Sequence, residues 1–138
     1  MLSRFAKLTT MIATMALTTF LLFPSVSNGQ GNDRLARGRQ LYIQHCASCH
    51  GMDAKGNGPV ASELKTAPSN LTTIAQRHGG KFDSIHVQLN IDGEKEVPAH
   101  GSRDMPVWGA YFRSTKGESY SKMNVYALAE YLKAVQVR

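Results

Sequence analysis

The stretch Cys46-Ala47-Ser48-Cys49-His50 places two thiols three residues apart and an imidazole directly after the second thiol. On a helix, residues three and four apart share one face, so these three side chains can point at the same object. Two thiols at this spacing can add to the two vinyl groups of a haem, and the histidine can then lie beneath the iron. This spacing is typical of the attachment site of a c-type haem.

Three other interpretations of the two cysteines compete with haem attachment. A zinc site needs about four nitrogen or sulfur ligands, whereas the chain has two cysteines and no second C-x-x-C or H-x-x-x-H pair. A thioredoxin-like redox pair should follow a strand, whereas the residues before Cys46 favour a helix. A disulfide would close a very small loop and remove little entropy from the unfolded chain. None of the three accounts for His50 directly after the second cysteine as well as haem attachment does.

The first 27 residues have the pattern of an export signal. Arg4 and Lys7 precede an uncharged run over residues 8–23, and Pro24 and small residues follow up to Ser27. We expect cleavage after Ser27, with a cut near Gly29 as the alternative, so that residues 28–138 form one domain in the periplasm. An uncleaved segment 8–23 would instead anchor the domain to the outer face of the inner membrane.

The charge of the exported domain is modest. The formal net charge of the chain falls from +6 to +4 when Arg4 and Lys7 are removed with the signal, and two ionised haem propionates would lower it to about +2. A weakly basic exported domain is not an ordinary nucleic-acid binder. One domain of this size buries a modest core, so an apolar haem would fill much of it.

Helical periodicity and turn residues predict an all-α domain with long loops. We expect a helix from Asn32 or Asp33 towards Cys46, with Gly38 permitting a close crossing by the last helix, near residues 120–135. Shorter helices are expected over residues 60–64, 71–77 (capped by Asn70) and 83–91. Prolines and glycines predict that residues 93–118 are irregular, and the apolar side chains among them indicate packing against the open face of the haem.

Several histidines and methionines could supply a second iron ligand opposite His50. Met52 and His45 are too close to His50 along the chain to reach the opposite face. Helix positions suggest that Met123 is core and that His78 and His86 are surface or supporting groups. The remaining candidates are Met105 and His100.

Met105 is favoured over His100. Pro106 holds Met105 in an extended conformation, and Trp108 can bury its ring against the haem. A thioether stabilises ferrous iron better than a second imidazole, so ligation by His50 and Met105 predicts a comparatively high reduction potential.

Taken together, these motifs resemble those of class I c-type cytochromes, in particular the small exported bacterial monohaem proteins. The residues that carry the resemblance are Gly38-x-x-x-Tyr42-x-x-x-Cys46-x-x-Cys49-His50-Gly51, Gly56-x-Gly58-Pro59, Met105-Pro106-x-Trp108-Gly109 and Leu128-Ala129-x-Tyr131-Leu132. The stretch between Arg77 and Met105 is longer than in the most compact members of the family.

The resemblance implies the cytochrome c fold, in which the N- and C-terminal helices cross near Gly38 and Tyr131 around one covalently attached haem. It implies that His50 and Met105 ligate the iron and that Pro59 accepts a hydrogen bond from the other ring nitrogen of His50. The cofactor-binding residues that we expect are Cys46, Cys49, Pro59, Tyr42 and Trp108.

The expected function is single-electron transfer between redox proteins, without chemistry on a substrate. Partners would be a donor and an acceptor such as a dehydrogenase or a terminal oxidase, guided by basic side chains: Lys55, Lys81, Arg103, Arg113 and Lys116. One alternative is a dedicated haem subunit of a multi-subunit oxidoreductase complex. Another is a gas-binding or peroxidase protein with an open iron site, which requires that Met105 does not ligate the iron.

Overall fold

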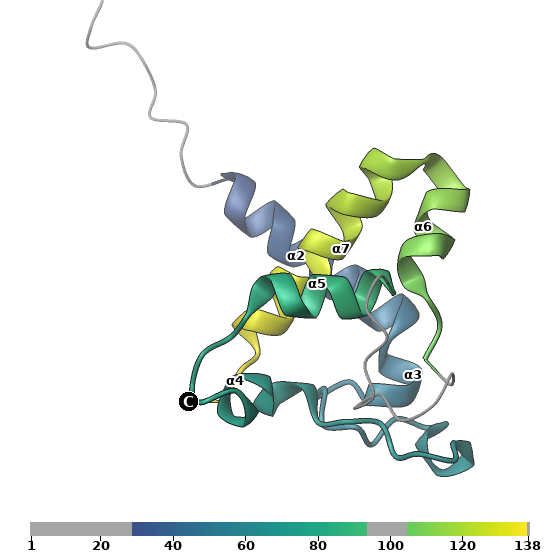
Figure 1. Ribbon diagram of the computed structural model, residues 1–138, viewed down its shortest axis with the longest axis vertical. Coiled ribbons are helices and arrows are strands. Elements are labelled where there is room, and N and C mark those ends of the chain that lie inside the picture. Colours follow the sequence, from purple (N-terminus) through teal and green to yellow (C-terminus); the bar gives the residue numbers. More distant parts are fainter. Residues whose placement is uncertain (1–28, 94–104, 138) are drawn as a thin grey trace, which may run out of the picture.

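The computed structural model describes residues 29–93 and 105–137. Within these ranges every regular element is helical and no strand occurs, which confirms the all-α prediction (Figure 1). In chain order the elements are α2 (Gly29–His45), α3 (Ala47–His50), the 3-10 turns η2 (Ala61–Glu63) and η3 (Leu71–Thr73), α4 (Ile74–Arg77), α5 (Ser84–Asp92), α6 (Trp108–Lys116) and α7 (Glu118–Ala134). The predicted signal peptide and His100 lie outside the described residues.

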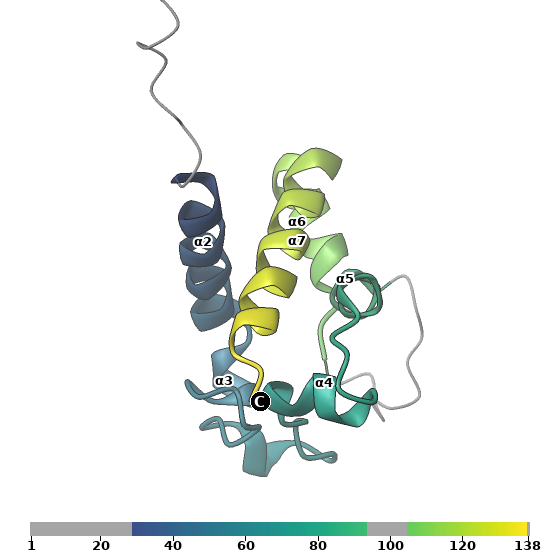
Figure 2. The same ribbon diagram turned by 90° about the vertical axis from the view of Figure 1, so that its left-hand side faces the viewer.

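The first and last long helices, α2 and α7, pack directly against each other, and Figure 2 shows them side by side. Gly38 makes this approach possible, because a Cβ atom there would collide with the carbonyl oxygen of Ala127 and lie 2.8 Å from Cβ of Tyr131. The rings of Tyr42 and Tyr131 meet beside this crossing, with centroids 5.3 Å apart. The predicted crossing at Gly38 is therefore confirmed.

The expectation that residues 93–118 are irregular is wrong for their second half. Helix α6 runs from Trp108 to Lys116 between Pro106 and Gly117, and it includes Gly109. Tertiary contacts override the weak helix propensity of that glycine. Phe112 is buried against the core, and the Ser121 hydroxyl donates to the carbonyl oxygen of Gly109 over 3.1 Å.

The caps of the shorter helices follow the sequence closely. The side chain of Asn70 accepts a hydrogen bond from the backbone N–H of Thr72 at 2.9 Å. The Asp83 carboxylate accepts from the N–H groups of Ile85 and His86, and Gly93 ends α5 in the left-handed region. Some bounds differ from expectation: α2 begins at Gly29, the helix expected over residues 60–64 is the 3-10 turn η2, and residues 71–77 divide into η3 and α4.

The end of α7 is tied to the segment that contains η3 and α4. The side-chain amide of Gln136 donates to the carbonyl oxygen of Leu71 at 2.7 Å, and its oxygen accepts from the N–H of Ala75 at 2.9 Å. The N–H of Val137 donates to the carbonyl oxygen of Thr72. These bonds hold residues 71–75 against the C-terminal end of the last helix.

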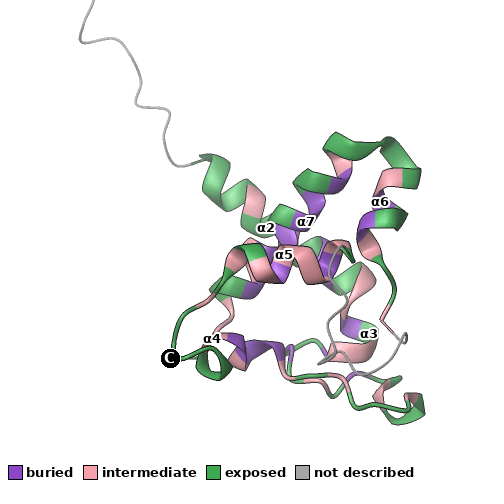
Figure 3. Ribbon diagram, in the orientation of Figure 1, coloured by how far each residue is buried: buried purple, intermediate pink, exposed green. Residues whose placement is uncertain are grey.

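Buried residues gather where α2, α5, α6 and α7 converge, and a second group of buried residues lies within η3 and α4 (Figure 3). Leu128 and Leu132 of α7 belong to this core and also line a cavity between the two groups of elements. None of the helices in the described ranges is long and apolar enough to cross a membrane.

Candidate functional site

The C-x-x-C-H motif forms one helical turn at the end of the first long helix. Cys46 donates its N–H to the carbonyl oxygen of Tyr42, and His50 donates its N–H to that of Cys46 at 2.9 Å. This turn directs both thiols and the His50 ring to one side, as the spacing predicts.

The glycine-rich loop after the motif closes the C-terminal end of α3. Backbone N–H groups of Gly56, Gly58 and Val60 donate to the carbonyl oxygens of His50, Cys49 and Ser48. These carbonyls have no partner within so short a helix, so the loop satisfies them. Gly58 is needed because a Cβ atom there would collide with the carbonyl oxygen of Ser48.

Tyr42 holds the other side of this turn. It is buried, and its hydroxyl donates to the carbonyl oxygen of Gly51 over 2.7 Å. Burial raises the pKa of this phenol well above its usual range, and the nearby Cys46, Tyr131 and Asp53 side chains raise the pKa further by smaller amounts. The hydroxyl therefore remains a donor. Tyr42 therefore positions the residue directly after the motif.

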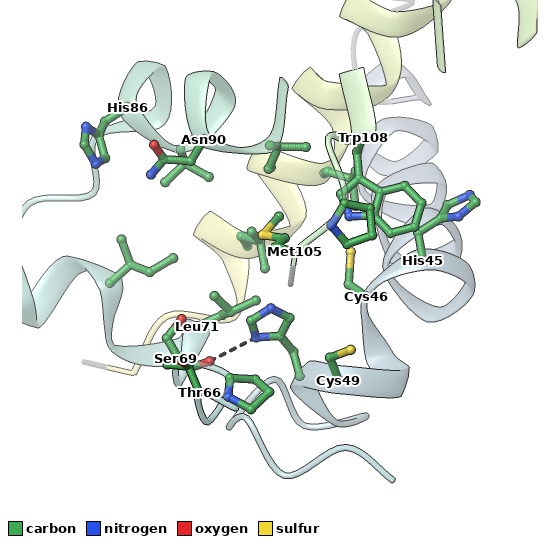
Figure 4. A pocket seen from close by; sticks show the side chains of 18 of the residues that line it. His45, Cys46, Cys49, Thr66, Ser69, Leu71, His86, Asn90, Met105 and Trp108 are labelled. Atoms are coloured by element: carbon green, nitrogen blue, oxygen red, sulfur yellow. Dashed lines mark hydrogen bonds between the residues drawn. The ribbon is translucent and has the colours of Figure 1, made fainter. Parts of the chain in front are cut away.

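The ring of His50 is oriented by the backbone of a distant segment. Its Nδ1 lies 3.0 Å from the carbonyl oxygen of Ser69 (dashed line in Figure 4). A carbonyl oxygen only accepts, so Nδ1 carries a proton, and in the neutral imidazole the lone pair is then on Nε2. This is the tautomer that an iron ligand requires, and such a second partner fixes the orientation of a ligating imidazole.

The hydrogen bond to Ser69 corrects the partner that the resemblance implies. We expected the carbonyl oxygen of Pro59 to accept from the ring nitrogen, whereas the acceptor at 3.0 Å from Nδ1 is Ser69. Pro59 lies between Gly58 and Val60, whose N–H groups both bond to α3. The physical reason is that Pro59 belongs to the loop that closes α3, while residue 69 lies where the chain turns back towards Ala54.

A cavity of about 260 Å³ opens beside the motif. Figure 4 shows Cys46, Cys49, Met105 and Trp108 around it, and His50 lines it as well. Five of the expected site residues are thus brought together. Tyr42 and Pro59 do not occur among the residues that line the cavity. The apolar part of the wall is formed by Leu64, Leu71, Ile74, Val87, Ile91, Leu128 and Leu132.

The two cysteines are free thiols in the structure. Burial raises the pKa of the Cys46 thiol to about 12, with a further increase from the neighbouring Cys49. A redox-active C-x-x-C pair depends on a stabilised thiolate, which is the opposite arrangement. The described residues also contain no cluster of three or more His, Cys, Asp or Glu side chains able to hold a metal ion.

His45 lies beside the cavity within a group of aromatic rings. The centroids of Trp108, Phe112 and Tyr111 lie 4.9, 5.4 and 5.5 Å from its own. Burial lowers the pKa of His45, so its imidazole is neutral near neutral pH. Its neighbours make His45 part of the packing between α2 and α6.

Sequence reasoning missed part of the cavity lining. Arg77, His78, His86 and Asn90 all contribute to it, although His78 and His86 were expected to be surface or supporting groups. No local pattern distinguishes a cavity-facing histidine from a solvent-facing one on so short a helix. Only the position of α5 relative to α3 brings His86 and Asn90 to the cavity.

The first and last helices of this domain cross, and the C-x-x-C-H motif lines its cavity. Both features are typical of the class of haem-bearing electron-transfer proteins. The model of the cytochrome c family matches residues 35–136. The chain therefore belongs to the cytochrome c family, whose members transfer electrons. No solved structure matches the chain significantly.

One protein of known description is similar to part of the same domain. Over 72 residues the chain is 35% identical to a protein from Sinorhizobium medicae (strain WSM419) described as a Cbb3-type cytochrome c oxidase subunit FixP. The match covers 52% of this chain and 20% of the relative. The chain therefore corresponds to about a fifth of that protein.

The residues present fit one covalently attached haem c. Cys46 and Cys49 supply the two thiols, and His50 lines the cavity beside them with its ring oriented by Ser69. One observation beyond the motif supports the fit: the side-chain oxygen of Asn90, which lines the cavity, is buried without a hydrogen-bond partner. Such an orphaned acceptor indicates that a bound group completes this site.

Proposed function

We propose that the protein is a single-electron carrier in which His50 and Met105 are the two axial ligands of the haem iron. The observation that carries this proposal is the hydrogen bond from Nδ1 of His50 to the carbonyl oxygen of Ser69, which orients the ring and, in the neutral imidazole, makes Nε2 the nitrogen that can ligate a metal. Met105 lines the same cavity (Figure 4), and its thioether is a ligand that favours the ferrous state.

The side chains of the cavity would keep the electron-transfer centre closed to other chemistry. A bound haem c supplies an iron that gains and loses one electron. Leu128, Leu132 and Trp108 give the cavity an apolar lining, and Ser69 holds His50 in a fixed orientation. Two retained protein ligands leave no open coordination position for oxygen or peroxide, so electron transfer is the expected activity.

The decisive experiment is a spectroelectrochemical titration of the purified holoprotein with a carbon monoxide challenge. We expect a low-spin protein that does not bind carbon monoxide in the ferrous state at neutral pH. Met105→Ala should bind it and have a lower reduction potential. Met123→Ala is the matched control, because Met123 is half exposed on α7. Carbon monoxide binding to the unaltered protein would overturn the proposal and favour a gas-binding or peroxidase function.

A second candidate function is that of a haem subunit within an oxidase complex. The similarity to the oxidase subunit from S. medicae favours it. Val107 and Tyr111 are 52% and 50% exposed close to Met105, although Phe112 is buried and adds nothing to this surface. Size-exclusion chromatography of detergent-solubilised membranes tests this candidate. Elution with a larger subunit supports it, and elution as a small free protein rejects it.

We further propose that the protein is exported to the periplasm by residues 1–27, which lie outside the described residues. Redox partners would bind a weakly basic surface. Lys55 and Lys116 are exposed, although Lys55 lies 3.7 Å from the Asp53 carboxylate, and Arg113 forms an ion pair with Asp92. Arg103 lies outside the described residues. N-terminal sequencing of the mature protein tests the export proposal, because an intact Met1 would contradict cleavage.

A further inference from the structure

The cavity has one end at which polar and cationic side chains gather. Arg77 ends α4, His78 follows it, and His86 and Asn90 lie on α5. All four line the cavity, and the rings of His78 and His86 are 5.5 Å apart. No Asp or Glu occurs among the described lining residues. Every charge that this part of the wall can carry is therefore positive.

The thiols lie at the other end. Figure 4 shows Cys46, Cys49 and Trp108 on one side of the cavity and His86 and Asn90 on the opposite side. The imidazole near the thiols, His45, is kept neutral by burial. The two ends of the cavity therefore differ: the side chains that can carry a positive charge lie at the end far from Cys46 and Cys49.

Covalent attachment determines which edge of a haem faces each end. The thioethers form at the vinyl side of the macrocycle, and the two carboxylate side chains project from the opposite side. A haem held by Cys46 and Cys49 must therefore direct its carboxylates away from α3, towards α4 and α5. We infer that Arg77, His78, His86 and Asn90 form the binding site for the carboxylates of the attached haem. This inference rests on the proposed function.

The contacts of two residues support this site. Arg77 donates from Nη1 to the carbonyl oxygen of Asn70 at 2.7 Å, which holds the guanidinium at the rim of the cavity. The Asn90 oxygen is buried without a partner. The side-chain amide of Asn90 carries an acceptor oxygen and a donor NH2 group. Rotation of this amide by half a turn would present the NH2 group to a carboxylate. The two acidic groups of this segment are already engaged: Asp83, which caps α5, accepts from the N–H groups of Ile85 and His86, and Asp92 pairs with Arg113.

The test uses holoprotein whose haem carboxylates carry ¹³C, introduced through labelled 5-aminolevulinic acid. Redox-difference infrared spectra then report the carboxylate bands directly. We expect Arg77→Gln and His86→Gln each to shift these bands. Arg77→Gln should also lower the ratio of reduced to oxidised protein about threefold at the potential where the unaltered protein is half reduced, because a cation near the haem favours the reduced state.

Two matched variants keep the test decisive. Arg77→Lys retains the charge and should restore most of the potential. Lys81→Gln removes an exposed cation between His78 and Asp83 that does not line the cavity, and it should leave the bands unchanged. Unshifted bands and potentials in both the Arg77→Gln and His86→Gln proteins would overturn the inference. Carbon monoxide binding measured on the same samples reports separately on the proposed function.

Discussion

Nδ1 of His50 donates a hydrogen bond to the carbonyl oxygen of Ser69, 19 residues further along the chain, at 3.0 Å. The two residues approach because the segment after Pro68 returns to the motif, where the N–H of Leu71 bonds to the carbonyl oxygen of Ala54. A strong acceptor on the outer nitrogen makes the imidazole a better electron donor to a metal. The backbone at residue 69 would therefore tune the imidazole that we propose as an iron ligand.

Asn70→Ala should loosen this arrangement without touching the cavity. The Asn70 side chain accepts hydrogen bonds from the N–H and the hydroxyl of Thr72, at 2.9 and 2.7 Å. We expect a loss of about 1 kcal/mol in the free energy of unfolding, as for other lost caps. The reduction potential should rise, because a weaker bond to Ser69 makes His50 a poorer donor to ferric iron. Denaturant titration and spectroelectrochemistry measure the two effects, and an unchanged potential would contradict the role of Ser69.

Gly38→Ala should destabilise the holoprotein by about 1 to 3 kcal/mol, because the added methyl group collides with the backbone of α7. Gly31→Ala is the matched control in the same helix, since a Cβ atom there meets nothing within 4 Å. The control should be neutral or slightly stabilising. Guanidinium denaturation followed by the haem absorbance compares them. Equal stability of the two variants would show that the helices do not cross at Gly38.

Asp92→Asn should make Met105 a more labile ligand. The Asp92 carboxylate pairs with Arg113 at 2.8 Å, and a Cβ atom at Gly93 would meet the side chain of Val107. These contacts join α5 to the stretch that follows Met105. We expect added imidazole to displace Met105 several-fold faster in the variant, given a lost interaction of about 1 kcal/mol. Glu118→Gln breaks only an exposed pair with Lys122 and should leave the rate unchanged.

Asp83 should make the stability of the protein depend on acid pH. The hydrogen bond from the N–H of His86 is the largest effect on the pKa of this carboxyl and lowers it; desolvation opposes this, and the N–H of Ile85 then adds to the lowering, so that the pKa lies below its usual range. A carboxyl whose pKa is lowered by folding stabilises the protein above about pH 4. That contribution is lost as the pH falls through the lowered folded pKa. Asp83→Asn keeps a capping oxygen without a charge, so its stability relative to the unaltered protein should improve at lower pH.

Local chemistry allowed much of the fold to be predicted from sequence. The caps at Asn70 and Asp83 and the close approach at Gly38 each depend on one residue type with a specific physical property. Helix α6 was missed because Phe112 and Ser121 stabilise it through tertiary contacts, which outweigh the glycine at its start. Propensity alone cannot register such contacts.

The candidate site was predictable to the extent that its chemistry is contiguous in the chain. Cys46, Cys49 and His50 lie within one turn, so their common direction follows from helix geometry. Ser69, His86 and Asn90 reach the cavity only through the packing of separate segments. Ser69 acts through its backbone, which every residue possesses, and therefore no side-chain pattern could mark it.

The crossing of α2 and α7 also has a consequence for biogenesis. The thiols lie at the end of the first helix, whereas Leu128 and Leu132 in the opposite wall come from the last. Gln136 and Val137 then fasten residues 71–75. A growing polypeptide would thus display its cysteines long before it could enclose anything beside them. The walls of the cavity therefore come from segments that are synthesised long after the cysteines, up to the contacts of Gln136 and Val137.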